Sequence, residues 1–117
     1  MASESIQLLK RSPHENPVLS EIVRRLVDVY RPERIYLFGS AARGESGPDS
    51  DFDVMVVVSD SALPELRRSR PSYKALRGIG FPIDVLVRTR AEFEKRLHLQ
   101  ASLPSTVVRE GKLLYAA

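Results

Sequence analysis

A glycine–serine pair and two acidic residues stand close together in this sequence. Gly39 and Ser40 follow one apolar run, and Asp51 and Asp53 come directly before the next, Val54 to Val58. A glycine turn lets the backbone approach a phosphate closely, and carboxylate oxygens are ligands that Mg²⁺ prefers. The spacing therefore predicts a site that holds a phosphate-bearing ligand beside a divalent cation.

The spacing of the acidic pair also predicts its geometry. Asp51 and Asp53 are two residues apart at the start of an expected strand, so their side chains should point to the same face. Ser40 stands where a short helix should begin, and its hydroxyl and the nearby N–H groups could grip a phosphate. Arg43, three residues later, could contact the same phosphates.

A third carboxylate interrupts a later apolar run. Asp84 lies within Pro82 to Val87, and a charge inside an apolar strand is costly unless it is paired or binds a metal. A buried salt bridge to an arginine is the alternative explanation. If a neighbouring strand places Asp84 beside Asp51 and Asp53, the three acids fit two-metal phosphoryl or nucleotidyl transfer. Asp84 would then be a metal ligand and the acceptor of a proton.

Two better-known motifs are excluded by single residues. Gly39 to Ser46 has the glycine spacing of a phosphate-binding P-loop, but Glu45 stands where the lysine must reach the phosphates. The acidic residues that begin at Asp49 imitate a calcium-binding EF-hand loop. That loop needs glycine at its sixth position and glutamate at its twelfth, and here these are Val54 and Asp60.

Length and composition indicate an ordinary globular domain. The 117 residues are 43% hydrophobic and 28% charged, and none is cysteine, which excludes thiolate catalysis, disulfides and cysteine zinc sites. Residues 1–60 carry 7 Lys/Arg and 10 Asp/Glu, whereas residues 61–117 carry 11 and 5. An acidic half that binds cations and a basic half that faces solvent, nucleotide or a partner explain this better than nucleic-acid binding.

Helices and strands should alternate along the chain. We expect a helix from Pro17, capped by Asn16, to just before Pro32; a strand Arg34–Phe38; a short helix after Ser40; a strand Phe52–Ser59; a helix after Asp60-Ser61 that Pro71 kinks or splits; a strand Pro82–Val87; a helix after the capping box Thr89–Glu92; a helix Pro104–Glu110; and a strand Lys112–Tyr115. This order predicts an α/β (α+β) domain with helices packed on a small sheet. We expect residues 1–16 to be a flexible N-terminal segment and residues 17–117 to form the single domain.

No part of the sequence is typical of a membrane span or a signal peptide. The first 17 residues hold no long apolar stretch, and no segment approaches the ~20 apolar residues that a transmembrane helix needs. We therefore expect a cytoplasmic protein that has no membrane partner.

These motifs together resemble one superfamily. The pattern Gly39-Ser40-x-Ala42-Arg43-Gly44, followed by Ser50-Asp51-x-Asp53, is similar to the signature of the polymerase-β-like nucleotidyltransferases. On so short a chain it is closest to the minimal nucleotidyltransferases. Two later segments, Pro82-Ile83-Asp84-Val85 and Glu110 to Tyr115, also fit that family, so the resemblance covers about residues 18–115.

The resemblance implies a fold, an activity and a partner. It implies the nucleotidyltransferase fold with a mixed sheet, and transfer of a nucleoside monophosphate, AMP from ATP as first choice, with Mg²⁺ in a two-metal site. Carried over by motif, Gly39 and Ser40 would bind the triphosphate, and Asp51, Asp53 and Asp84 would bind magnesium. Proteins of this kind are often antitoxins that pair with a HEPN ribonuclease toxin, and some silence the toxin by nucleotidylating it.

Two other functions stay open from the sequence. The protein could be an antitoxin that acts by contact alone and has lost turnover, although binding alone would not need three costly carboxylates. It could also modify a small hydroxylated molecule, but the sequence shows no added domain for such an acceptor. We therefore expect a partner protein to present the hydroxyl, within a homo- or hetero-oligomer.

Overall fold

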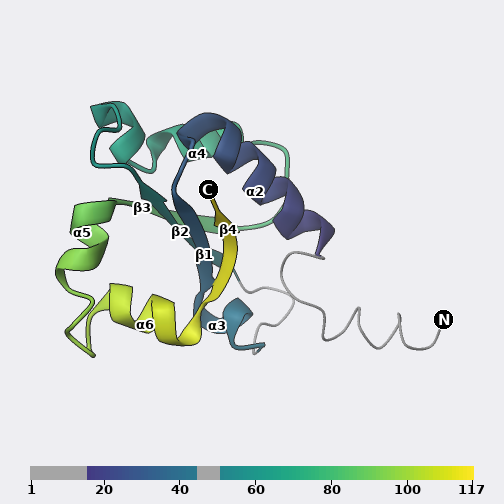
Figure 1. Cartoon of the computed structure of the whole chain (residues 1–117). Helices are drawn as coiled ribbons and strands as arrows, with labels where there is room; N and C mark the ends of the chain where they lie inside the picture. Colours follow the sequence, from purple (N-terminus) through teal and green to yellow (C-terminus); the bar gives the residue numbers. More distant parts are fainter. Residues whose placement is uncertain (1–15, 45–50) are drawn as a thin grey trace.

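The computed structural model describes residues 16–44 and 51–117, and these form a four-stranded sheet with helices on both faces (Figure 1). The strand order is β3-β2-β1-β4. Strand β1 pairs antiparallel with β2 and β4, whereas β2 and β3 are parallel, so the sheet is mixed as expected. The strands are β1 (Arg34–Phe38), β2 (Phe52–Val58), β3 (Ile83–Thr89) and β4 (Lys112–Ala116). The segment expected to be flexible, residues 1–16, lies outside the described residues except for Asn16, and so do residues 45–50.

Two layers of helices enclose the sheet. Helices α2 (Pro17–Tyr30) and α4 (Arg70–Ala75) cover one face, and α5 (Arg90–Lys95) and α6 (Leu103–Glu110) lie on the other (Figure 1). Each face has its own core, because alternate residues of β2 point to opposite sides. Val54, Val56 and Val58 pack under α2, while Met55 and Val57 pack with residues of α5 and α6. In residues 16–44 and 51–117, no helix combines the length and the apolar character that crossing a membrane requires.

Helix α2 begins and ends as its sequence predicts. The Asn16 side chain accepts hydrogen bonds from the N–H groups of Val18 and Leu19, at 2.9 and 3.2 Å, and Pro17 occupies the first turn. The helix stops at Arg31, which adopts a left-handed conformation before Pro32. The buried stripe holds α2 against the sheet and consists of Leu19, Ile22, Leu26 and Tyr30.

The connection from β2 to β3 is split into two helices, one of the two outcomes predicted for Pro71. Pro71 does not kink a helix but lies in the first turn of α4, after a separate 3-10 helix η2 (Pro64–Arg67). A proline fits there because the first N–H groups of a helix have no intrahelical partner. Asp60 does not cap this segment either: its carboxylate accepts a hydrogen bond of 2.8 Å from the Ala91 N–H at the start of α5.

Helix α5 follows directly from β3, as the sequence predicts. Thr89 and Glu92 form the expected capping box, with bonds of 2.7 and 3.2 Å between side chain and backbone. Phe93 of α5 is buried and stacks on Tyr36 of β1, with ring centroids 5.6 Å apart. These contacts fix α5 over the face of the sheet that carries Met55.

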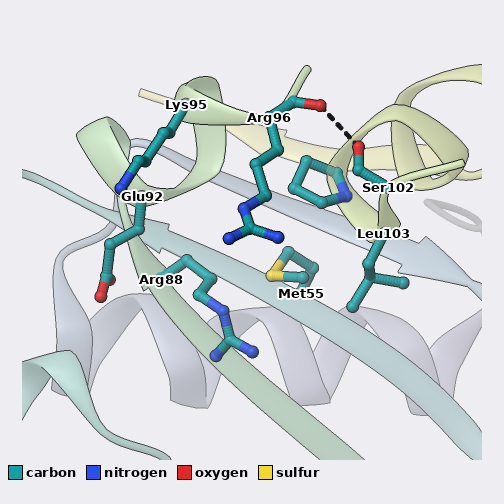
Figure 2. A pocket seen from close by; sticks show the side chains of 8 residues that line it. Met55, Arg88, Glu92, Lys95, Arg96, Ser102 and Leu103 are labelled. Carbon is teal, nitrogen blue, oxygen red and sulfur yellow. Dashed lines mark hydrogen bonds between the residues drawn. The ribbon is translucent and has the colours of Figure 1, made fainter. Parts of the chain in front are cut away.

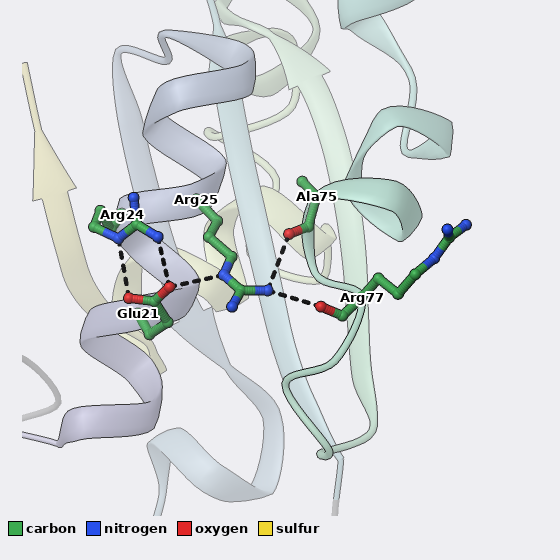
Figure 3. A network of polar contacts seen from close by, with 5 residues as sticks. All are labelled: Glu21, Arg24, Arg25, Ala75 and Arg77. Carbon is green, nitrogen blue, oxygen red and sulfur yellow. Dashed lines mark hydrogen bonds and ion pairs between the residues drawn. The ribbon is translucent and has the colours of Figure 1, made fainter.

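A polar network joins α2 to the last residue of α4 and to the chain that follows it (Figure 3). Glu21 receives hydrogen bonds from Arg24 and Arg25, and these hydrogen bonds lower the pKa of its carboxyl to about 2. Arg25 also donates to the carbonyl oxygens of Ala75 and Arg77, at 3.3 and 2.8 Å. Of the three charged side chains in this network, Arg25 is the one that donates across from α2 to the end of the β2–β3 connection.

Replacement of Arg25 should destabilise the domain. We expect Arg25→Met to lower the free energy of unfolding by about 1–2 kcal/mol, because two backbone carbonyls lose their donor. The shift in Tm should be several degrees, measured by thermal unfolding followed by circular dichroism. Arg24→Met is the matched control, since Arg24 binds the same carboxylate without reaching the carbonyls, and it should change Tm little. Equal shifts for both variants would contradict this role of Arg25.

Candidate active site

The glycine–serine pair forms the turn that ends β1. Gly39 has φ +72°, a conformation that favours glycine, and a four-residue helix α3 (Gly39–Ala42) begins there. Ser40 was expected to cap this helix, but the cap residue is Phe38, and Ser40 lies within the first turn. Ser40 is displaced from the cap because the turn starts at Gly39, the residue that can adopt the left-handed conformation.

Strand pairing brings this turn to the acidic residues. Phe38, the last residue of β1, pairs with Asp53 of β2, and Asp53 pairs with Asp84 of the parallel strand β3. Paired residues of neighbouring strands project to the same face. Asp53 and Asp84 therefore lie side by side on the face that α5 and α6 cover, at the end of the sheet where Gly39 begins its turn. Asp51 precedes β2 and is exposed.

Asp53 is the most constrained of the three acids. A Cβ atom on Gly39 would collide with the Asp53 carboxylate, so the turn backbone packs directly on this side chain. Burial raises the pKa of Asp53, and the charges of Asp84 and Asp51 raise it further, while Arg43 lowers it. The Asp53 carboxylate is thus surrounded by negative charge, and a bound cation would reduce the repulsion between the acids.

Asp84 does not have the environment that the sequence predicted. It is exposed at the edge strand, so neither a buried salt bridge nor a large desolvation cost explains it. The cost of burying charge falls instead on Asp53.

The residues are compatible with magnesium, although they do not form a complete cage. Within residues 16–44 and 51–117, no three His, Cys, Asp or Glu side chains form a group that could hold a metal ion. Magnesium commonly uses only one or two carboxylates and completes its shell with water and substrate phosphates. The paired Asp53 and Asp84, with Asp51 acting electrostatically on Asp53, meet that requirement. Binding of magnesium by all three acids remains a prediction.

Arg43 ends the short helix that begins at the Gly39 turn. It follows α3 as the C-cap residue, and its backbone N–H donates to the Gly39 carbonyl at 3.2 Å. Its guanidinium lies 3.9 Å from the Glu110 carboxylate at the end of α6, and its charge acts on Asp53. Arg43 is therefore close to the acidic pair, where it could meet a bound phosphate.

The structure also shows a feature that we did not predict from the sequence. A pocket of about 350 Å³, here called the basic pocket, lies between β2, β3, α5 and the start of α6 (Figure 2). Its lining consists of three cationic side chains, three apolar ones, one acid and one serine: Arg88, Lys95, Arg96, Met55, Leu103, Pro104, Glu92 and Ser102. One sequence signal was present, since Arg88 and Asp84 are four residues apart in one strand and share a face. The rest of the pocket depends on how α5 and α6 pack.

Comparisons with known proteins agree with this geometry. The family described as "Nucleotidyltransferase domain" matches residues 18–114. A relative from Methanocaldococcus jannaschii, named "Putative protein adenylyltransferase", is 31% identical over 106 residues, which cover 87% of this chain and 99% of the relative. The chain therefore belongs to the nucleotidyltransferase domain family and is a nucleotidyltransferase, and its resemblance to the minimal nucleotidyltransferases is confirmed.

Solved structures confirm the fold. A toxin–antitoxin crystallised with AMP-PNP is 27% identical, with a TM-score of 0.59 over 84% of this chain and 73% of that one. A protein from Sulfolobus solfataricus described as a "putative nucleotidyltransferase" is 22% identical, with a TM-score of 0.57 over 98% of this chain and 86% of that one. The mixed sheet with helices on both faces is thus the nucleotidyltransferase fold.

Neutralising Asp53 should stabilise the protein. Because its pKa is raised above the ordinary 3.8, the folded state binds the proton more tightly than the unfolded state does. The free energy of unfolding should therefore fall as the pH rises from the unfolded pKa through the folded one. In metal-free buffer at pH 7, we expect Asp53→Asn to raise Tm, and this gain should vanish below about pH 3.8. The exposed Asp28→Asn is the control and should show no such gain; a lower Tm for Asp53→Asn at pH 7 would refute the argument.

Gly39 and Gly44 form a matched pair for testing the turn. Their φ angles are +72° and +73°, but a Cβ on Gly39 would strike Asp53, whereas nothing lies within 4 Å of one on Gly44. Gly44→Ala should cost about 1–2 kcal/mol of stability, the cost of a left-handed alanine. Gly39→Ala should cost more, because the carboxylate must also move, and it should lose nucleotidyl transfer. Urea unfolding and a transfer assay test this; equal stabilities would show that the contact with Asp53 has no energetic role.

Proposed function

We propose that this protein transfers AMP from ATP to a hydroxyl of a partner protein, and that the partner is a HEPN-type toxin for which it is the antitoxin. The observation that carries the proposal is the pairing of Asp53 with Asp84 directly beside the Gly39 turn. The name of the Methanocaldococcus relative, a protein adenylyltransferase, supports a protein acceptor. The similar toxin–antitoxin with AMP-PNP, an analogue of ATP, supports both the nucleotide and the kind of partner. A reaction that consumes ATP also favours the cytoplasm.

The proposed roles follow the order of the strands. Gly39 and Ser40, at the end of β1, bind the triphosphate through backbone N–H groups and the serine hydroxyl, and Arg43 contributes a positive charge. Asp51 and Asp53, at the start of β2, hold magnesium together with Asp84 of β3. Residues 17–117 would thus act as one catalytic domain.

The transfer itself is an in-line displacement. The acceptor oxygen forms a bond to the α-phosphorus, the bond from that phosphorus to the bridging oxygen of the β-phosphate breaks, and pyrophosphate leaves. A carboxylate oxygen of Asp84 takes the proton of the acceptor hydroxyl, since Asp84 is exposed and can be reached from outside the sheet. Bound magnesium supplies charge neutralisation of the phosphates and a lower pKa of the acceptor hydroxyl. The Gly39 turn packs on Asp53 and fixes its carboxylate. Asp53 would in this way hold the nucleotide at a constant position relative to Asp84.

Labelled nucleotides test the proposal. The purified protein is incubated with magnesium, each labelled NTP and a candidate partner, first the product of the adjacent gene. We expect label from ATP on the partner, and a loss of at least about 100-fold in rate for Asp53→Ala and for Asp84→Ala. Omission of magnesium should have a similar effect. Asp28→Ala, an exposed aspartate of α2, is the matched control and should keep full activity.

The same assay separates the proposal from its rivals. If the partner is inhibited equally by wild type and by the Asp53 and Asp84 variants, with no label in any sample, the protein acts by binding alone. If label appears only on a small hydroxylated molecule, the reaction class stands but the protein acceptor is wrong.

A further inference from the structure

The basic pocket lies on the same face of the sheet as the acidic pair. Met55 is two residues beyond Asp53 in β2, and Arg88 is four residues beyond Asp84 in β3. Since a strand rises about 3.3 Å per residue, the pocket begins about 7 Å from Asp53 along the sheet. It is therefore close enough for one protein segment to contact both places.

The pocket holds positive charge that the protein does not neutralise. Arg88 donates to the carbonyl oxygen of Val87 at 2.9 Å, and among the described residues no salt bridge reaches Arg88, Lys95 or Arg96. Both arginines line the pocket; in Figure 2 the guanidinium group of Arg96 lies beside Met55, whereas that of Arg88 points away from Arg96.

The single acid at the pocket does not balance these three cations. The carboxylate of Glu92 is held by the Thr89 N–H at 2.7 Å as part of the capping box. An anion that entered the pocket would offset the remaining repulsion between like charges.

The position of the pocket indicates which anion enters it. In an in-line displacement, the acceptor and the leaving pyrophosphate lie on opposite sides of the α-phosphorus. The proposed triphosphate-binding residues Gly39 and Ser40 lie on the β1 side of Asp53, and Asp84 lies on the β3 side. The acceptor should therefore arrive over β3, which also contributes Arg88 to the basic pocket.

We infer that the basic pocket binds an acidic segment of the acceptor protein, close to the hydroxyl that is modified. An Asp or Glu side chain of that segment lies between Arg88 and Arg96, and an apolar neighbour packs on Met55 and on Leu103, which is 38% exposed. A volume of about 350 Å³ suits one or two side chains rather than a whole domain. This inference rests on the proposed function, because it names the chemistry of the acceptor for that reaction.

Charge reversal in the pocket tests the inference. Transfer of labelled AMP to the partner identified above is measured for Arg88→Glu, Arg96→Glu and the matched control Arg70→Glu, an exposed arginine of α4 on the other face. For the two pocket variants we expect KM for the acceptor to rise about tenfold or more at low salt. Their kcat and KM for ATP should stay within about twofold, and added salt should shrink the difference.

A binding measurement gives a readout without turnover. A fluorescein-labelled glutamate-rich peptide should bind wild type and Arg70→Glu more tightly than the pocket variants, and inorganic tripolyphosphate should not displace it competitively. Circular dichroism checks that each variant is folded. An unchanged KM for the acceptor in folded pocket variants would overturn the inference. A matching rise in KM for ATP, or competitive displacement by tripolyphosphate, would overturn it too and assign the pocket to the triphosphate. If wild type labels no protein, the proposed function fails and this inference fails with it.

Discussion

The parallel pairing of β2 with β3 is the constraint on which the rest of the site depends. Asp53 lies opposite Asp84 only in the observed register, and a shift of one residue would send Asp84 to the other face of the sheet. Parallel neighbours need a long crossover, which here contains η2 and α4 and packs beside α2. Arg25 and Tyr30 of α2 bind carbonyl oxygens of this crossover, so the helix layer on one face fixes the register that the other face uses.

The site lies where an apolar strand meets a polar turn. This position explains why the charged carboxylate of Asp53 destabilises the fold. Val54 to Val58 are buried on both faces of β2. Asp53 comes directly before this buried run and is only partly buried, so a charge can be tolerated there. Even there, burial and the neighbouring acids raise its pKa. Asp84 lies on the edge strand and is exposed. A concentration of like charge that weakens the fold is typical of a functional site, because packing alone would select a neutral residue.

Much of the fold could be predicted from the sequence, because it depends on local patterns, and so could the meeting of Asp53 and Asp84 on paired strands, while the roles of these acids stay predictions. The buried run of β2, the capping box at Thr89 and the amphipathic stripe of α2 are each specified within a few residues. The predictions are wrong where contacts between residues distant in the sequence determine the environment of a side chain. Asp60 binds the start of α5 rather than its own segment, and Asp84 is exposed because β3 is an edge strand. Nothing local to either residue reveals these facts. The basic pocket was missed for the same reason, since four separate segments form it.

The arrangement of charge across the sheet gives a physical reason for an acidic acceptor segment. The paired acids at the centre of the site repel any anionic segment, so an acidic acceptor needs compensating charge nearby to approach them. The basic pocket supplies that charge on the β3 side, one or two side-chain lengths from Asp53, where it does not compete with the turn at Gly39. A neutral or basic acceptor would need no such pocket and would be drawn to the acids directly. The placement of three cations beside β3 therefore discriminates between acceptors by charge, and it does so without altering the residues proposed to carry the transfer.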